Sequence, residues 1–200
     1  MKKLRNWTFG LLVICSACLG HVHGQSFDPV KVAQLHGGLI VQLGASDIQS
    51  AARLSLTGRY LIHVMDPDSK AIQSARSALR KNGHYGLVWA EQARNKTRLP
   101  YAENVVNQIV VRDYSVGASE LARVLVPGGS IVVANADILS QSQLEAAGFA
   151  SFAKQSSGLV ARKPWPAEMD DWSHPRHGSD GNAVSKDTLV GPPDRVRWIA

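Results

Sequence analysis

Cysteine is nearly absent from this chain of 200 residues, and its absence limits the chemistry available. Both cysteines, Cys15 and Cys18, lie within the first 24 residues. The rest of the chain therefore has no disulfide, no thiolate metal site and no cysteine nucleophile. The sequence also lacks a Gly-x-Ser-x-Gly elbow and a Gly-x4-Gly-Lys-Ser/Thr loop. These absences argue against a serine hydrolase and against a P-loop nucleotide-binding protein.

Residues 1–24 have the composition of a secretory signal peptide. A basic start (Lys2, Lys3 and Arg5) precedes an apolar run over residues 9–19, and small residues lead to Gln25. The apolar run is too short to span a bilayer, so we predict cleavage before Gln25 and export to the periplasm or the extracellular space. An uncleaved membrane anchor is the alternative. We expect no membrane span after cleavage.

The basic character of the chain comes partly from this leader. The whole sequence has 22 lysines and arginines against 16 acidic residues, and removing the three basic residues of the leader leaves 19 against 16. An excess of three positive charges is a weak reason to expect nucleic acid as a partner. A small cluster formed by Arg94, Lys96 and Arg98 has no aromatic side chains for base stacking, and we interpret it as a solvated loop.

Residues 28–163 alternate between strand and helix patterns, which predicts an α/β domain with a mostly parallel sheet. The clearest helix spans residues 68–81, with Asp68 as its N-cap. Pro127-Gly128-Gly129 predicts a tight turn, and two runs around residues 156–157 predict a terminal antiparallel hairpin. The expected strands are 39–43, 60–64, 87–90, 105–111, 130–134, 149–155 and 158–163, and the expected helices are 29–35, 47–56, 68–81, 119–125 and 140–147.

The first two strands carry the pattern of a nucleoside-binding βαβ unit. An apolar run ends at Gly44, and a second run ends at Asp66, 22 residues later. The glycine lets the backbone approach a ligand, and the acid accepts hydrogen bonds from ribose hydroxyls. An NAD-binding site shares this logic, but it needs a Gly-x-Gly-x-x-Gly turn of which only Gly44 is present.

Several motifs occur in the order found in one large enzyme family, and residues 37–163 resemble the class I S-adenosylmethionine-dependent methyltransferases, in particular the methyltransferase type 11 group. The resemblance implies a Rossmann-like fold whose mostly parallel sheet ends in an antiparallel hairpin. The motifs are Leu39 to Gly44, Val64-Met65-Asp66, Trp89-Ala90-Glu91, Leu99 to Glu103, Val105 to Asp113 and Glu120 to Gly129, the last being the most specific.

The same resemblance implies a cofactor and a set of site residues. S-adenosylmethionine would be the cofactor, with Gly44 facing its methionine portion, Asp66 holding the ribose and Glu91 lying near the adenine. Arg112 and Asp113 would line the reaction side, and Asp113 is the one candidate base. The methyl acceptor would be a small molecule or a protein.

Three positions depart from the family pattern. Gln42 stands where the family has an acid, and Ser46 and Ile48 stand where it has glycines. In addition, S-adenosylmethionine is made in the cytoplasm, so an exported domain would be separated from its supply. Two hypotheses therefore stay open: a methyltransferase, or a non-catalytic binding or scaffolding module of the same fold.

Residues 164–200 differ in composition, with many prolines and tryptophans and no helical period. We interpret them as a linker and the truncated start of another domain. Residues 169–200 resemble the entrance to a quinoprotein-like (PQQ-like) β-propeller, which would then be a partner in cis. His174 and His177 lie in a proline-containing loop without a helix to orient both rings, so we predict no metal site. His63, within the second strand, is predicted to be packed or paired rather than a base.

Overall fold

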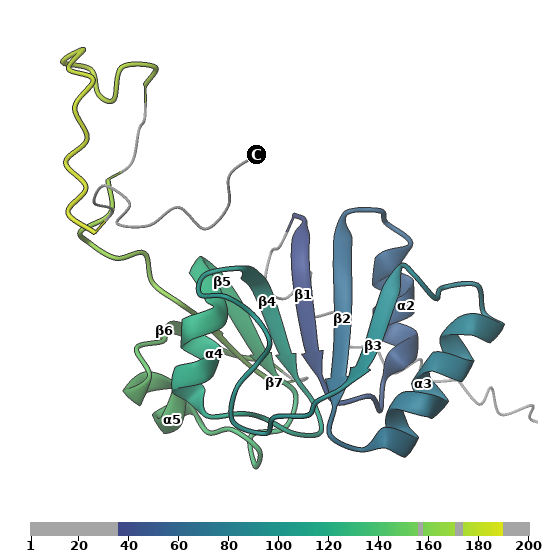
Figure 1. Cartoon of the computed structure of the whole chain (residues 1–200). Coiled ribbons are helices and arrows are strands. Elements are labelled where there is room, and N and C mark those ends of the chain that lie inside the picture. Colours follow the sequence, from purple (N-terminus) through teal and green to yellow (C-terminus); the bar gives the residue numbers. More distant parts are fainter. Residues whose placement is uncertain (1–35, 156–157, 171–173, 190–200) are drawn as a thin grey trace, which may run out of the picture.

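The computed structural model describes residues 36–155, 158–170 and 174–189. The predicted signal peptide and the predicted helix at 29–35 lie outside the described residues, as does the end of the tail. The described chain forms a seven-stranded sheet in the order β3-β2-β1-β4-β5-β7-β6 (Figure 1). The strands are β1 (Gly38–Leu43), β2 (Tyr60–Asp66), β3 (Val88–Gln92), β4 (Val106–Val111), β5 (Leu125–Val133), β6 (Ala150–Gln155) and β7 (Gly158–Arg162).

The direction of the strands confirms the predicted Rossmann-like methyltransferase fold. Strands β1 to β5 pair in parallel, whereas β7 pairs antiparallel with both β5 and β6. The order reverses at β1, where the chain crosses from β3 to β4 on the far side of β1. In open parallel sheets, ligands bind beyond the carboxyl ends of the strands at such a reversal point. This topology therefore directs attention to the ends of β1, β2 and β4.

Side-chain caps fix where three of the four described helices begin. Asp47 accepts from the N–H of Ser50, Asp68 accepts from Lys70 as predicted, and Ser140 forms a capping box with Gln143. Each cap satisfies a backbone N–H that has no partner within its helix. The helices are α2 (Ile48–Ser55), α3 (Ser69–Lys81), α4 (Ala118–Val124) and α5 (Gln141–Ala146).

The two faces of the sheet are covered differently. Helices α2 and α3 pack on one face of β1, β2 and β3, around a core that includes Ile62, Ile72 and Leu79. Helices α4 and α5 pack on the other face, around a core that includes Ile109 and Leu121 (Figure 1). Each face thus buries apolar side chains that alternate along the strands, which stabilises the sheet at the edge that carries the candidate site.

The predicted turn at Pro127-Gly128-Gly129 is wrong in detail. The structure places these residues inside β5, where they bulge out of the pairing with β4: Val106 opposes Leu125, yet Gln108 opposes Ser130. Gly128 has φ +74°, a conformation that favours glycine, and the bulge lets β5 begin directly at the end of α4. The prediction missed this because a turn and a bulge use the same residue types.

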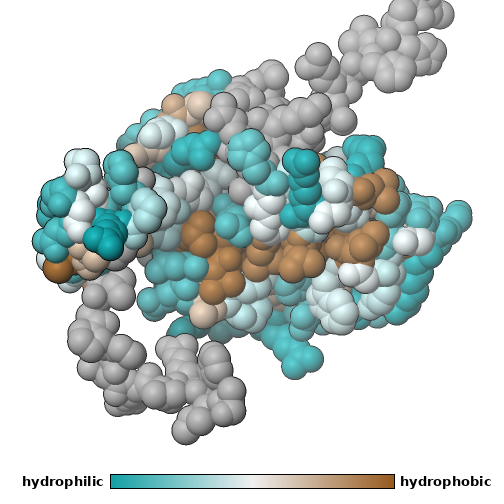
Figure 2. Space-filling view, turned by 90° about the horizontal axis from the view of Figure 1, so that it is seen from above, coloured by the Kyte–Doolittle hydropathy of each residue, from teal (hydrophilic) through white to brown (hydrophobic). Residues whose placement is uncertain are grey.

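Residues 93–105, which link β3 to β4, form a loop without a helix, as predicted for residues 94–103. Consequently no helix covers the face of β2 and β3 that lies opposite α2 and α3, called the open face below, although Tyr101 of the loop contacts it at His63 and Met65. Leu61, Leu87 and Trp89 are all about half exposed or more. Figure 2 looks onto the end of the sheet at which strands β1 to β5 begin, and there it shows a band of hydrophobic surface across the described part of the molecule. Exposed apolar side chains gathered in this way are uncommon on single domains.

The described part of the tail is held by a local polar cluster. His177 contacts Asp170 at 2.7 Å, and the backbone N–H of Lys186 donates to the same carboxylate. These hydrogen bonds, that of His177 first, lower the pKa of Asp170 to about 2. Among the described residues, no helix is long and apolar enough to cross a membrane, and no group of three metal-ligating side chains is present.

Candidate functional site at the carboxyl edge of the sheet

Three of the predicted site residues meet at the carboxyl edge of the sheet. Gly44 follows β1 and donates its N–H to the carbonyl of Met65 at 2.8 Å, so it lies beside Asp66 at the end of β2. Asp113 follows β4, and its N–H points to the carbonyl of Leu43 at 3.3 Å. Parallel pairing of β1 with both β2 and β4 brings these positions together from distant parts of the sequence.

Asp66 is buried, with 7% of its surface exposed, and its carboxylate is firmly oriented. One oxygen accepts from the backbone N–H of Ala45 at 3.0 Å, and the other accepts from that of Asp68 at 2.8 Å. A carboxylate oxygen can accept two hydrogen bonds, so each retains capacity for a ligand hydroxyl. The orientation of the Asp66 carboxylate is thus consistent with the ribose-binding role that the sequence predicted for it.

The turn at Gly44 is closed by side chains of the protein itself. Gly44 has φ +112°, and a Cβ at this position would collide with the carboxylate of Asp113. The same carboxylate accepts from the N–H of Ser46 at 3.0 Å, while the amide of Gln42 donates to the carbonyl of Gly44 at 2.9 Å. Both N–H groups of the turn, those of Ala45 and Ser46, thus already donate to carboxylates.

Arg112 and Glu91 lie apart from this turn. The guanidinium of Arg112 forms a 3.0 Å ion pair with Asp47, the residue that caps α2. The carboxylate of Glu91 lies 3.7 Å from Nε2 of His63 on the open face of the sheet. The structure therefore brings Gly44, Asp66 and Asp113 together and gives Arg112 and Glu91 other partners.

Two cavities open at this edge, one beside each of two neighbouring residues of β2. The cavity at Asp66 has a volume of about 510 Å³, and the one at Met65 has a volume of about 310 Å³. Both volumes lie in the range of small-molecule sites. The larger is lined by Ala45, Ser46, Ile48, Asp66, Asp68 and Asp113 with part of α3, and the smaller by Met65, Glu91, Gln92, Arg94, Leu99 and Pro100 among others.

A Tyr–His–Glu arrangement lies on the open face. Sequence reasoning named its histidine and, as a residue near the adenine, its glutamate, but it gave Tyr101 no role. The hydroxyl of Tyr101 pairs with Nδ1 of His63, and the two rings meet edge-on with their centroids 5.9 Å apart. This confirms the prediction that His63 is paired. Burial lowers the pKa of His63, and the negative charge of Glu91 opposes that shift. Burial likewise raises the pKa of Tyr101, so this hydroxyl stays protonated.

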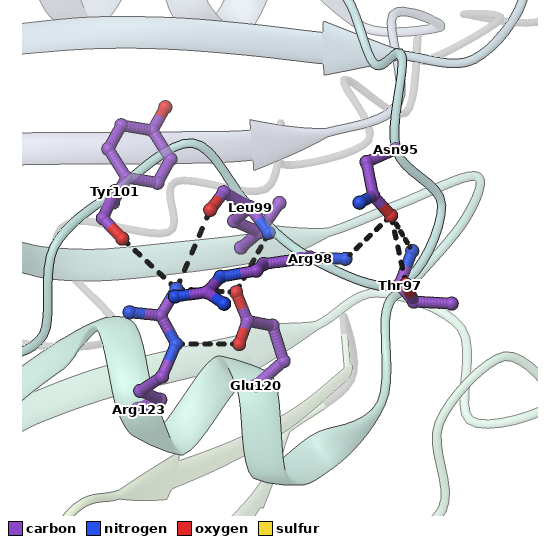
Figure 3. Close-up of polar contacts among 7 residues, drawn as sticks. All are labelled: Asn95, Thr97, Arg98, Leu99, Tyr101, Glu120 and Arg123. Atoms are coloured by element: carbon purple, nitrogen blue, oxygen red, sulfur yellow. Dashed lines mark hydrogen bonds and ion pairs between the residues drawn. The ribbon is translucent and has the colours of Figure 1, made fainter.

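The loop that carries Tyr101 is fastened to α4, as Figure 3 shows. Glu120 accepts from the N–H of Leu99 at 2.8 Å, and Arg123 donates to the carbonyl of Tyr101 at 3.0 Å. Glu120 and Arg123 also pair with each other, with Nε and Oε2 2.7 Å apart. Because two side chains of one helix bind the loop backbone, Tyr101 is held in place over His63.

Tyr114, one residue beyond Asp113, was also missed. Its hydroxyl is buried and has no hydrogen-bond partner among the described residues. Burial, and then the negative charge of Asp66, raise the pKa of Tyr114. In the sequence, only its position just after β4 pointed to this tyrosine. That its hydroxyl is buried without a partner can be seen only in the folded structure.

Solved structures share this fold at low sequence identity. The [4+2]-cyclase SpnF matches with a TM-score of 0.57 and 18% identity over 68% of this chain and 79% of its own. A putative S-adenosylmethionine-dependent methyltransferase from Methanococcus maripaludis matches with a TM-score of 0.54 and 14% identity, over 68% and 81%. An S-adenosylmethionine-dependent methyltransferase from Aquifex aeolicus matches with a TM-score of 0.53 and 15% identity, over 68% of this chain and 88% of its own.

No family model and no curated protein sequence matches this chain. The likeness shows the fold alone: the described residues have the Rossmann-like architecture of these methyltransferase structures. A shared fold does not by itself establish a shared reaction, and one of the three neighbours is described as a cyclase. The function has to be argued from the site.

The adenosine half of S-adenosylmethionine fits the residues present. Asp66 offers oriented acceptors for ribose hydroxyls, and the adjoining cavity has room for a nucleoside. The amino-acid half meets a turn whose two N–H groups are in use and whose glycine is covered by Asp113. Binding of the whole cofactor therefore requires the side chain of Asp113 to rotate away from Gly44.

Proposed function

We propose that this chain binds S-adenosylmethionine at the carboxyl edge of its sheet and acts as a methyltransferase-like domain. The observation that carries the proposal is the buried carboxylate of Asp66, held by two backbone N–H groups beside the Gly44 turn. In this arrangement Asp66 binds the ribose hydroxyls, and Gly44 allows close approach of the backbone.

The cofactor, when bound, supplies an electrophilic methyl group for transfer to a small-molecule or protein nucleophile. The contribution of this chain to such a reaction is orientation of the two reactants. Asp113 is the candidate base, and it becomes available when its carboxylate leaves the N–H of Ser46. Arg112, paired with Asp47, and Glu91, beside His63, each have a protein partner in this arrangement.

Calorimetric titration of the full-length chain with S-adenosylmethionine and S-adenosylhomocysteine tests the proposal. We expect saturable binding of both, and we expect Asp66→Asn to weaken it by at least about tenfold, because hydrogen bonds to a charged acceptor are lost. Glu103→Gln removes the same charge before the start of β4, at the opposite edge, and serves as the control. Absence of binding at millimolar ligand would refute the proposal.

A second candidate function is a non-catalytic binding or scaffolding module, and the closed turn favours it. Gln42 and Asp113 both bond to the turn in the positions described above. The double substitution Gln42→Glu with Ser46→Gly restores two features of the family pattern. If it creates cofactor binding that the unmodified chain lacks, the second function is supported; micromolar binding by the unmodified chain argues against it.

The setting of the domain is also part of this proposal. The character of residues 1–24 supports export, and the resemblance of residues 169–200 supports a propeller-like domain in cis. Mass spectrometry of the protein recovered from an exporting host tests the first point, since cleavage would leave Gln25 as the first residue. Sequencing of the gene past the codon for Ala200 tests the second, because a propeller requires several repeated four-stranded blades.

A further inference from the structure

The open face of β2 and β3 presents large apolar side chains to solvent. His63 and Trp89 are neighbours in the parallel pairing of the two strands, and Leu61 lies two residues before His63, so all three side chains lie on this face. Leu61 is 71% exposed, and Trp89 is 51% exposed. An exposed apolar surface bordered by polar residues is typical of a site where a protein binds a partner.

Positive charge is concentrated in the chain segments around this face. Residues 69–98, which comprise α3, β3 and the start of the loop that follows, contain seven lysines and arginines and one acidic residue, Glu91. The excess of six positive charges in this segment equals the formal net charge of the whole chain, +6. The positive and negative charges of all other residues therefore cancel, and the surroundings of the open face form a basic region that attracts acidic partners.

The arginines of this segment lie beside the apolar surface. The guanidinium of Arg80 lies over the ring of Tyr85, with its carbon 4.8 Å from the ring centre, and the rings of Tyr85 and Trp89 have their centroids 6.2 Å apart. Arg94 and Arg98 line the smaller cavity, which opens at the carboxyl end of the same face. An apolar centre with a charged rim has the anatomy of a protein–protein interface.

We propose that the open face binds an acidic amphipathic segment of another protein. The apolar side chains of this segment pack against Leu61 and Trp89, and its carboxylates lie toward Arg80, Arg94 and Arg98. Complementary charge then fixes the orientation of the segment and speeds its association. This inference does not depend on cofactor binding, because the surface lies on a face of the sheet and the cofactor is proposed to bind beyond the strand ends at Asp66.

Two features of the face favour such a segment over other partners. Single-stranded nucleic acid gains affinity by stacking bases on aromatic rings, and an exposed leucine such as Leu61 adds nothing to that stacking. β3 is the edge strand of the sheet (Figure 1), and Arg76 donates to the carbonyl of Ala90 at 2.8 Å, so one acceptor that an added strand would use is taken. We therefore place the segment on the face and not along the edge.

Fluorescence anisotropy of labelled synthetic peptides, titrated with the full-length chain, tests the inference. One peptide combines leucine and glutamate in an amphipathic pattern, a second has lysine in place of glutamate, and a third has serine in place of leucine. We expect the leucine–glutamate peptide to bind at least about tenfold more tightly than either of the others, because it alone matches both the apolar surface and the charge. Equal binding of the two leucine peptides, or no binding of the leucine–glutamate peptide, would overturn the inference.

Substitutions on this face test where the peptide binds. Trp89→Ser should weaken binding of the leucine–glutamate peptide by about tenfold or more, since tryptophans at interfaces often dominate the affinity. Trp165→Ser changes another exposed tryptophan, beside the cavity at the opposite edge, and should leave the affinity within about twofold. The double reversal Arg80→Glu with Arg94→Glu alters two exposed side chains and should shift the preference toward the leucine–lysine peptide, a result that does not require Trp89→Ser to fold.

Two other occupants of the face would give distinct results. If single-stranded oligothymidine binds more tightly than the leucine–glutamate peptide and Trp89→Ser abolishes that binding, the face is a nucleic-acid site and the inference is wrong. If sedimentation shows a dimer that Trp89→Ser dissociates, and no peptide binds, the occupant is a second copy of this chain and the inference is equally wrong. Titration with S-adenosylhomocysteine is unaffected by either result, so the proposed function stands or falls separately.

Discussion

Gly44 is the residue on which the geometry of the candidate site depends most. Its φ of +112° is strained for any side chain, and its missing Cβ leaves the space that Asp113 fills. The hydrogen bond from Ser46 to Asp113 joins residues 67 positions apart in sequence. One glycine thus allows the turn after β1 and the segment after β4 to touch.

Gly44→Ala should therefore lower the stability of the fold, through backbone strain and through collision of the new Cβ with Asp113. A second glycine separates these two causes. Gly83 also has a positive φ, +72°, but no atom lies within 4 Å of the position of its Cβ. We expect Gly83→Ala to lower the free energy of unfolding by about 1 kcal/mol, from backbone strain alone. Gly44→Ala should lower it by about 3 kcal/mol or more, since a collision is added. Equal losses in urea denaturation would show that Asp113 does not press on the turn.

His63 should make stability depend on pH. Burial lowers its pKa in the folded state below the ordinary value of 6.5, although Glu91 opposes the shift. The unfolded chain then binds the proton more readily, so the stabilisation is complete above pH 6.5 and declines as the pH falls below that value. His63→Gln should reduce the loss of unfolding free energy between pH 8 and pH 5.5. His84→Gln, in the turn after α3, is the control, and an equal effect from both substitutions would contradict this assignment.

The sequence was sufficient to locate Asp66 and Gly44, because each follows a recognisable apolar strand. It was not sufficient to assign partners to Glu91, Arg112 and Asp113. Those side chains bond to residues that are distant in sequence or on another element, and the choice among nearby partners is made only when the sheet assembles. The local sequence pattern predicted which residues lie at the carboxyl edge. The hydrogen bonds that close the Gly44 turn and the absence of a partner for the Tyr114 hydroxyl arise only in the tertiary structure.

At the scale of elements, capping residues and apolar periodicity accounted for most helices. The buried positions of α3 are Ile72, Ala75 and Leu79, the face that its spacing predicted, and Asp68 caps it. The bulge at Pro127–Gly129 was missed because pairing with β4 resumes beyond it, which no local pattern reveals. The link from β3 to β4 was predicted to be a loop, yet its fastening to α4 by Glu120 and Arg123 could not be read from sequence.

That fastening predicts a local effect of substitution. Arg123→Met removes the donors to the carbonyls of Leu99 and Tyr101 and takes away the charged partner of Glu120. We expect amide hydrogen exchange in residues 94–103 to accelerate by about tenfold, with little change in the central strands. Arg94→Met, an exposed arginine of the same loop, should have little effect on exchange. Uniform acceleration across the sheet would mean that Arg123 supports the whole fold instead.

At the scale of the whole molecule, the unusual feature is the asymmetry of the two sheet faces. One face of β1 to β3 is covered by α2 and α3, while no helix covers the opposite face of β2 and β3, which the loop after β3 contacts only in part. Leu61 on the open face is 71% exposed, and Leu79 on the covered side is 1% exposed.

This asymmetry predicts very different costs for the same substitution. Leu61→Ala should change the free energy of unfolding by less than about 0.5 kcal/mol, as is usual for an exposed side chain. Leu79→Ala should cost about 2–5 kcal/mol, because it empties a buried position. Chemical denaturation of both variants measures the difference. A large loss for Leu61→Ala would show that another part of the protein covers that face in solution.

The central claim is that a nucleoside binds at the carboxyl edge, between Asp66 and the Gly44 turn. Two-dimensional amide NMR of the full-length chain, titrated with S-adenosylhomocysteine, tests it most directly. The account predicts that the amides of Ala45, Ser46 and Asp68 shift most, because they bond to the two carboxylates at the site. Shifts gathered instead around Gly128 and Trp165, beside the cavity at the opposite edge, would contradict it, as would no shifts at all.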